Sequence, residues 1–404
     1  MDVNKLRRHF PALARTENGR PVVFADGPAG TQVPRAVIDA MAGYLRDGLS
    51  NLGGSFTASR DSGTTADGAR SAVADLVNCS PREVAFGQNM TSITFAASRA
   101  ISSRWSDGDN VVVTRLDHDA NITPWMTAAA DRGAQVRFCD FDPADGCRLD
   151  MDDLLSLVDR RTRLVAVTHA SNAVGTVVDV ARVADVAHSA GALVYVDAVH
   201  AGPHLSIDVQ QLDCDFLTCS AYKFFGPHTG ILYGKQELLD DIRPVKIRPA
   251  PDESPESWET GTQSFESLAG VEAAIGYLAA IGGGGTDRRS ALEESYGVIA
   301  VHESGLAERF LTGVAELPRL RLFGSDGSVP RVSTFALAVD GSTAAEAHHR
   351  LATEGIYTWA GHYYAIEVMR RLDIVGTGGL LRIGFVHYNT MEEVDRVLQA
   401  LAHL

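Results

Sequence analysis

The sequence predicts an α/β fold with a mostly parallel central sheet, followed by a smaller α+β domain. Between residues 70 and 235, short β-branched runs alternate with stretches of helical periodicity. Several runs are apolar at nearly every position, as in strands that are buried on both faces. Regular alternation of strands with helices is typical of a parallel sheet covered by helices on both faces.

Periodicity predicts helices at Ile122–Asp131, Met151–Val158 and Val180–Ser189, between the strands. Ligands of such sheets bind beyond the carboxyl ends of the strands, so polar residues that directly follow a strand are the first candidates for a site. The predicted strands are Asn110–Thr114, Gln135–Cys139, Leu164–Thr168, Leu193–Asp197, Phe216–Cys219 and Gly230–Tyr233.

The character of the sequence changes after residue 240. Asp240–Glu259 is rich in Pro, Asp and Glu and is predicted to be a loop, and Ser267–Ile281 is predicted to be a helix. The helix ends at Gly282–Gly285, but no Gly-Lys-Ser/Thr follows, so this glycine run is a connection rather than a phosphate loop. Residues 290–404 mix helices with strands at Ser333–Val339 and Leu380–Phe385, which predicts the second, smaller domain.

Composition excludes several classes of protein. The 404 residues are 45% hydrophobic and 22% charged, as in a globular protein, and the net charge of -15 disfavours a nucleic-acid partner. Apolar runs are far shorter than a membrane span, and no apolar segment follows the basic start, so we expect no membrane association and a cytoplasmic location. The five cysteines include no CxxC pair, so neither a disulfide framework nor a metal site is predicted.

The chemical signal lies at two strand ends. Lys223 follows the strand Phe216–Cys219, and Asp197 ends the strand Leu193–Asp197. A lysine that forms a Schiff base and a carboxylate that keeps a pyridine nitrogen protonated are what pyridoxal phosphate requires. Apolar and aromatic neighbours of Lys223 favour its uncharged amine. The sequence therefore predicts a pyridoxal phosphate enzyme.

Several segments together carry a family resemblance. They resemble motifs of the class V aminotransferase family of fold-type I pyridoxal phosphate enzymes, in its cysteine desulfurase-like branch, and the resemblance covers nearly the whole chain. It implies an N-terminal arm over residues 1–24 that joins the small domain, a large cofactor-binding domain over 25–275 and a small domain over 276–404. The segments are Phe24–Thr31 (FADGPAGT), Asp117–Trp125 (DHDANITPW), Thr168–Gly175 (THASNAVG), Glu259–Thr262 (ETGT) and Tyr388–Thr390 (YNT).

The resemblance implies roles around the cofactor ring. His118 matches the histidine that stacks on the pyridine ring, Asn172 the side chain that bonds the ring hydroxyl, and Asp197 the partner of the ring nitrogen. His200 stands where many relatives carry Gln; it can reach the ring hydroxyl and is expected to titrate near neutral pH.

The resemblance also implies a phosphate site. Met90 and Thr91 begin a predicted helix, Ile93–Ile101, and backbone N–H groups at a helix start favour an anion. Ser220 and Tyr222 are expected to add hydroxyl groups. Thr262 matches the residue that reaches the phosphate of the neighbouring subunit, which implies a homodimer with active sites at its interface.

The expected partner is a small-molecule amino-acid substrate. Arg382 matches the arginine that holds the α-carboxylate, for which its planar fork is suited. Trp359, His362 and Tyr364 belong to the loop in which desulfurases carry their sulfur-accepting cysteine. Tyr364 stands at that position, and a phenol cannot form a persulfide.

The departure at residue 364 leads us to expect a C–S lyase that acts on an S-substituted cysteine. In that hypothesis Lys223 removes the α-proton, Asp197 stabilises the protonated ring, and His118, His362 or Tyr364 protonates the leaving sulfur. Related decarboxylating or deaminating chemistry stays open. The alternatives are an amino-acid epimerase or aminotransferase of class V, a cysteine desulfurase, and a cofactor-binding scaffold without turnover.

Overall fold

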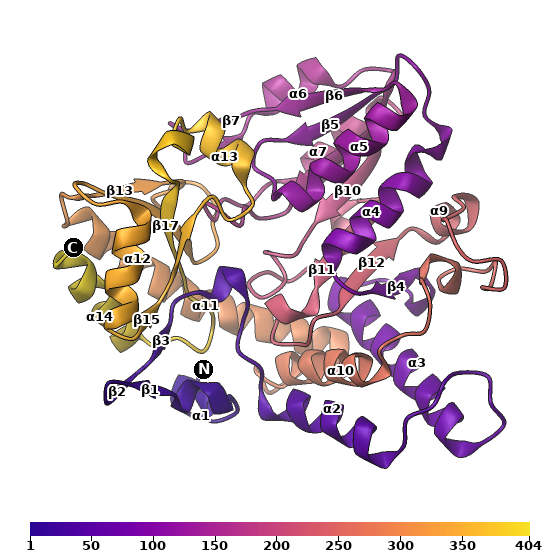
Figure 1. The fold of residues 1–404 in the computed structure, drawn as a ribbon, viewed down its shortest axis with the longest axis horizontal. Helices are drawn as coiled ribbons and strands as arrows, with labels where there is room; N and C mark the ends of the chain where they lie inside the picture. The colour runs from indigo at the N-terminus through magenta and orange to yellow at the C-terminus, as the bar shows by residue number, and fades with distance from the viewer.

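The computed structural model describes all residues, 1–404, and has the predicted α/β fold. Its centre is a seven-stranded sheet with the order β4-β12-β11-β10-β9-β5-β6 (Figure 1). The strands are β4 (Val84–Gly87), β5 (Asn110–Thr114), β6 (Gln135–Cys139), β9 (Thr162–Thr168), β10 (Leu193–Asp197), β11 (Phe216–Ser220) and β12 (Gly230–Gly234).

The sheet is mostly parallel, as predicted. Only β12 runs opposite to its two neighbours, β11 and β4. The six predicted strands are all present, each within two residues of its predicted bounds. Strand β4 was not predicted, because four residues directly after a turn of 3-10 helix are too few to show a periodicity.

Helices cover both faces of this sheet. Alternate side chains of β5 show the division, because Val111 and Val113 pack in one buried cluster and Val112 packs in another. The first cluster holds α4 (Met90–Ile101) and α5 (Thr123–Arg132). The opposite face is covered by α3 (Thr57–Val77), α6 (Met151–Leu157), α7 (Val180–Ser189) and α10 (Phe265–Ala279).

A second, antiparallel sheet forms the smaller part of the molecule, with the order β13-β14-β17-β16. It packs with three helices around a separate apolar cluster. Its elements are α11 (Arg288–Ala315), β13 (Leu320–Phe323), β14 (Thr334–Val339), α12 (Ala344–Thr353), β16 (Trp359–Gly361), β17 (Leu380–Gly384) and α14 (Met391–Ala402).

The N-terminal segment joins the smaller part. β3 (Val23–Phe24) pairs in parallel with β15 (Ile356–Tyr357), and Val23 and Ala25 belong to the apolar cluster of the smaller sheet. α2 (Arg35–Asp47) then packs against α10 on the larger part. The predicted domain bounds at residues 24 and 275 stay a prediction.

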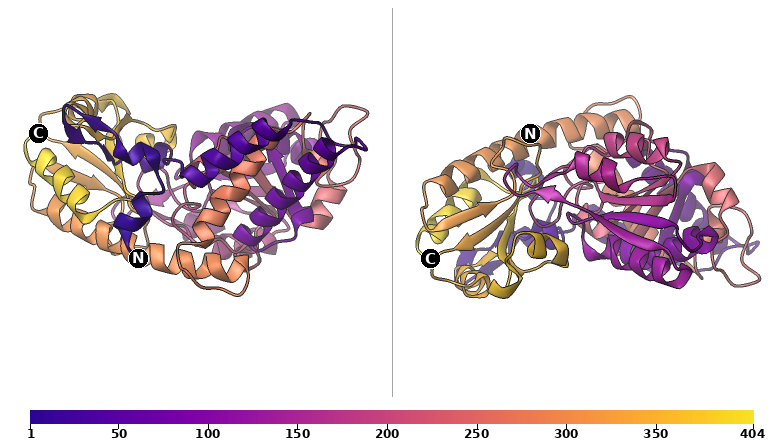
Figure 2. Two further views of the ribbon diagram at one scale, coloured as in Figure 1. Left: turned by 90° about the horizontal axis from the view of Figure 1, so that it is seen from below. Right: turned by 90° about the horizontal axis from the view of Figure 1, so that it is seen from above.

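The two parts lie side by side, and the long helix α11 runs along both (Figure 2). No helix combines the length and the apolar character that crossing a bilayer requires.

We expect Phe310→Ala to lower the free energy of unfolding by about 3–5 kcal/mol. The Phe310 ring is fully buried on α11 and contacts the rings of Phe335 and Phe385 at 4.4 and 5.5 Å between centroids. Guanidinium unfolding followed by circular dichroism measures the change. Val301→Ala, on the exposed side of the same helix, is the matched control and should change stability by less than about 0.5 kcal/mol. Equal effects of the two substitutions would contradict this packing.

Candidate active site

A cavity of ≈ 880 Å³ lies between the larger and the smaller sheet, at the carboxyl ends of β10 and β11. Both parts of the molecule contribute to its wall. It brings together all but one of the residues that the sequence predicts for the site: Met90, Thr91, His118, Asn172, Asp197, His200, Ser220, Tyr222, Lys223, Trp359, His362, Tyr364 and Arg382.

Thr262 is the exception. It is exposed and lines a neighbouring cavity, whose wall shares Asn89 and His228 with the first one. Within one chain Thr262 therefore does not face the other predicted residues, and its reach to a neighbouring subunit stays a prediction.

Lys223 follows β11 directly, and its amine points toward the N-terminal segment. Nζ donates a hydrogen bond to the Pro28 carbonyl at 2.5 Å. Burial and, to a smaller extent, the nearby Arg382 charge lower the pKa of Lys223, whereas Asp197 and Asp26 oppose the shift. The resulting pKa is about 7. A substantial share of the amine is thus uncharged at neutral pH, as a nucleophile or base requires.

Asp197 is buried at the end of β10, the strand that pairs with β11. One carboxylate oxygen accepts a hydrogen bond from the Val199 N–H at 2.9 Å. Burial raises the pKa of Asp197 to about 6, while the Val199 N–H and the Lys223 charge lower it. The carboxyl group can therefore share a proton with a basic ring nitrogen near neutral pH.

His118 has a defined tautomer. Its Nδ1 accepts a hydrogen bond from the Ala120 N–H at 3.0 Å, and burial lowers the pKa of His118 to about 4, helped by the Lys223 and Arg382 charges. The ring is therefore uncharged at neutral pH and carries its proton on Nε2. The Tyr364 ring lies nearly parallel to it, with 5.5 Å between centroids.

Asn172 offers an unused acceptor. Its Nδ2 donates to the Tyr363 carbonyl at 3.0 Å, but its buried Oδ1 has no hydrogen-bond partner. A buried acceptor without a donor is costly unless a ligand supplies one. The hydroxyl group of a pyridoxal ring is a donor of the required kind, so this side chain fits the cofactor.

The start of α4 suits an anion. Asn89 caps the helix by accepting from the Ser92 N–H at 2.9 Å, and the Met90 N–H donates to the Ser220 hydroxyl at 2.9 Å. The loop lies so close to β12 that a Cβ on Gly230 would collide with the Asn89 backbone. The first residues of the 12-residue helix α4 thus line the cavity together with Ser220, and a helix start favours an anion.

Arg382 approaches from β17 of the smaller sheet. It is 5% exposed, its Cζ lies 4.4 Å from the Tyr363 ring centroid, and its Nη1 donates to the Asn172 carbonyl at 2.9 Å. Burial lowers the pKa of Arg382 to about 10, which leaves it charged at neutral pH. Most donors of this guanidinium remain available for a carboxylate.

His200 departs from expectation. It is buried, and its Nε2 pairs with the Thr334 hydroxyl at 2.9 Å. The expected titration near neutral pH is wrong, because burial and the positive charges around it lower the pKa of His200 well below its usual value. Its predicted contact with the ring hydroxyl stays a prediction.

The loop that follows β16 closes one side of the cavity. Trp359 is 50% and Tyr364 is 68% exposed, whereas Tyr363 is buried. Tyr364 accepts a hydrogen bond from the Asp119 N–H at 2.7 Å through its carbonyl, and its own N–H donates to His362 Nδ1 at 3.0 Å. No cysteine lines the cavity, and four of the five cysteines are buried elsewhere.

Sequence reasoning assigned no role to Asp26. Its buried Oδ1 has no hydrogen-bond partner, and burial raises its pKa to about 6, while the Arg382 and Lys223 charges lower it. A carboxyl group between two buried cations is part of the site's electrostatics. Asp26 lies in the motif segment Phe24–Thr31, which could have marked it as a candidate, but only the fold shows which residues it faces.

Comparison with known proteins shows the family of the chain. The Aminotransferase class-V family pattern matches residues 23–397. Cysteine desulfurases from Synechococcus elongatus and Enterobacter sp. are each 33% identical over the whole chain, which spans 64% of the former and 98% of the latter. The apo structure of a cysteine desulfurase from Thermococcus onnurineus superposes with a TM-score of 0.88 at 25% identity, covering 99% of this chain and 97% of that one.

These relatives overturn the predicted function. The expectation of a C–S lyase acting on an S-substituted cysteine is wrong, because the relatives along the full chain are cysteine desulfurases in sequence and in structure. The predicted cofactor is confirmed, since this family uses pyridoxal 5'-phosphate. The chain thus belongs to the class V aminotransferase family and is a pyridoxal phosphate-dependent enzyme.

Proposed function

We propose that the enzyme has cysteine desulfurase activity and passes the sulfur to a thiol that arrives from solution. The reaction converts L-cysteine and R–SH into L-alanine and R–S–SH. The Cβ–S bond of cysteine breaks, an S–S bond forms, and one thiol proton ends on the alanine Cβ while the other stays on the persulfide. The observation that carries the proposal is the meeting of Lys223, Asp197 and Arg382 in one cavity of a desulfurase-like fold.

The cofactor would be held by residues of the larger sheet. Asp197 would pair with the ring nitrogen, Asn172 Oδ1 would accept from the ring hydroxyl, and His118 would stack on the ring. The phosphate would lie against the start of α4. When bound, pyridoxal phosphate supplies an electron sink for the charge that develops at the substrate Cα.

The remaining residues of the phosphate end would act through hydroxyl and backbone groups. Thr91 and Ser220 would donate from their hydroxyls, the Met90 segment from its backbone, and Tyr222 from its phenol. We also propose a homodimer, in which Thr262 of one subunit would complete the phosphate site of the other. Five free cysteines are consistent with a reducing compartment and support a cytoplasmic location.

Substrate handling would fall to three side chains. Arg382 would hold the α-carboxylate with its planar fork and so orient the Cα–H bond. Lys223, with its lowered pKa, would take up and return the proton at Cα. His118 carries its proton on Nε2 and would donate a hydrogen bond to the substrate sulfur as negative charge develops there.

The sulfur acceptor is the feature that distinguishes this chain. On the motif resemblance, Tyr364 would stand where the family carries its loop cysteine, and the cavity wall contains no cysteine. The exposed rings of Trp359 and Tyr364 lie on the rim. A free thiol would therefore meet the sulfur at this rim, and the enzyme itself would carry no persulfide.

Reduction with borohydride should fix the cofactor to Lys223, because its amine, with a pKa lowered to about 7, lines the same cavity as Asp197. Peptide mass spectrometry identifies the modified residue. Lys223→Ala should retain no cofactor after reduction and denaturation, whereas Lys246→Ala, which removes a surface amine paired with Asp252, should behave as wild type. Modification at Lys235 or Lys246 would overturn the assignment.

Alanine release at fixed L-cysteine should rise with the concentration of added dithiothreitol or glutathione, and the persulfide should be found on the added thiol. A variant with all five cysteines changed to Ser or Ala should keep its activity. Tyr364→Cys should acquire a persulfide on residue 364. A persulfide on any native cysteine during turnover, or a folded but inactive cysteine-free variant, would refute the external acceptor.

Arg382→Ala should lower kcat/KM for L-cysteine by about thirty- to several thousand-fold, since one partner of a buried charge pair is worth roughly 2–5 kcal/mol. Arg382→Lys keeps the charge but loses the fork and should recover only part of the activity. Cysteamine, which lacks the carboxylate, is the control substrate and should respond much less. Equal losses on both substrates, or loss of cofactor absorbance, would mean that Arg382 has a structural role.

A further inference from the structure

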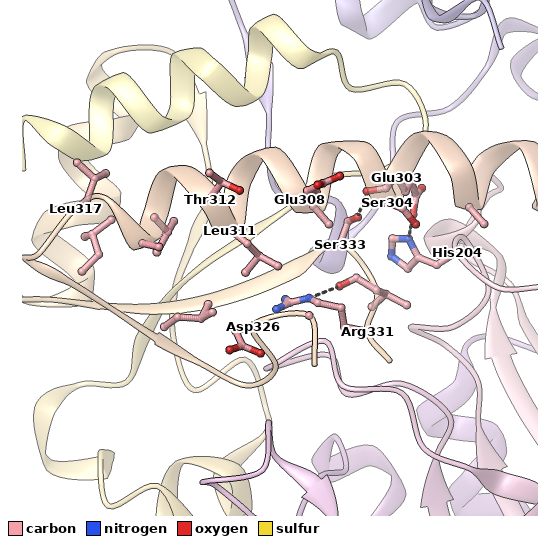
Figure 3. A pocket seen from close by; sticks show the side chains of 18 of the residues that line it. His204, Glu303, Ser304, Glu308, Leu311, Thr312, Leu317, Asp326, Arg331 and Ser333 are labelled. Carbon is pink, nitrogen blue, oxygen red and sulfur yellow. Dashed lines mark hydrogen bonds and ion pairs between the residues drawn. The ribbon is translucent and has the colours of Figure 1, made fainter. Parts of the chain in front are cut away.

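A second cavity of ≈ 870 Å³ lies away from the catalytic one, beneath α11 (Figure 3). Its walls come from α11, from β13 and from the segment 326–333 that leads into β14. It shares no lining residue with the catalytic cavity. The two are separated by the contacting rings of His200 and His204, whose centroids are 5.3 Å apart.

One end of this cavity is polar. His204 Nδ1 and Glu303 Oε2 form a hydrogen bond of 2.6 Å, and the two residues are only 4% and 5% exposed. Their other polar atoms, His204 Nε2 and Glu303 Oε1, are buried and have no partner. A carboxyl oxygen that takes no part in the hydrogen bond to Nδ1 is an acceptor. Glu303 Oε1 is thus a buried acceptor without a donor, beside a ring atom that also has no partner.

The charges along the wall favour a cation. Glu303, Glu308 and Asp326 line the cavity, against a single guanidinium, that of Arg331. Arg331 already donates to the carbonyls of Ser325, Val332 and Thr334. Carboxylates therefore outnumber cations on the wall of this cavity, and the Arg331 guanidinium already donates its hydrogen bonds to backbone carbonyls.

The other end of the cavity is apolar. Figure 3 shows His204 and Glu303 at one end of the pocket and Leu317 at the other, with Leu311 between them. An occupant that satisfies both ends needs N–H donors at one terminus and an aliphatic body. The other apolar residues of the wall include Val314, Leu320 and Leu322.

We propose that this cavity binds a small aliphatic ammonium, whose N–H groups donate to Glu303 Oε1 and whose chain lies against Leu311 and Leu317. The site does not depend on the proposed desulfurase activity, because none of its residues faces the catalytic cavity.

Isothermal titration calorimetry of the holoenzyme with N-methylhexylamine tests the proposal. This secondary amine offers two N–H donors when protonated, and because it cannot form a neutral imine with the cofactor aldehyde, it does not displace the cofactor from Lys223. We expect saturable binding of one molecule per chain without a spectral change. Hexanoate, which has nearly the same length but the opposite charge, should not bind.

Variants locate the binding. Leu311→Trp, which fills the cavity, should weaken binding at least tenfold, whereas Val301→Trp, on the exposed side of the same helix, should not change it. Glu303→Gln keeps an acceptor for His204 but removes the charge, and should weaken binding about tenfold to a hundredfold. If Glu303→Gln fails to fold, the comparison of the two tryptophan variants decides.

Three results would overturn the proposal. They are the absence of saturable binding, equal binding of hexanoate, and unchanged binding in a folded Leu311→Trp variant. The first would mean that water satisfies the two unpartnered atoms.

Discussion

The burial of two cations in one cavity constrains the rest of the structure. Burial lowers the pKa of both Lys223 and Arg382, and the charge of Arg382 lowers the pKa of Lys223 as well. Such a pair is tolerated only where carboxylates compensate, and here Asp197 and Asp26 do so. The pKa of Lys223 is about 7 and the pKa values of Asp26 and Asp197 are about 6, so the protonation states of these groups depend on one another around neutral pH.

The architecture supplies those charges from separate elements. Asp197 and Lys223 come from paired strands of the larger sheet, while Arg382 comes from β17 of the smaller one. Asp26 forms a parallel bridge with Gly384 on the same β17, and a Cβ at Gly384 would collide with the Pro28 ring. Because Pro28 also accepts the hydrogen bond of Lys223, the N-terminal segment is held between the two sheets and fixes the amine.

Sequence periodicity was sufficient for strands with strong local signals. β5 and β10 have the bounds that their apolar runs predict, because strands buried on both faces are apolar at nearly every position. Periodicity could not predict β4, which is too short to show one. It also could not predict that β12 runs antiparallel to its neighbours, since pairing direction is decided by contacts between distant segments. The same limit applies to Asp26, to the low pKa of His200 and to the His204–Glu303 pair, which arise only when residues far apart in the chain meet.

The loop at residue 364 is held in place by its backbone. Tyr363 and Tyr364 both have positive φ, 51° and 58°, which costs roughly 1–3 kcal/mol for each non-glycine residue. Their carbonyls accept hydrogen bonds from Asn172 Nδ2 and the Asp119 N–H, so the loop is tied to the segments that carry Asn172 and His118. These bonds involve the backbone of the loop and are indifferent to the side chain at residue 364. The Tyr364 ring can therefore lie beside the His118 ring without changing the shape of the cavity. On the proposed function, the enzyme cleaves the C–S bond, and an incoming thiol accepts the sulfur in place of a loop cysteine.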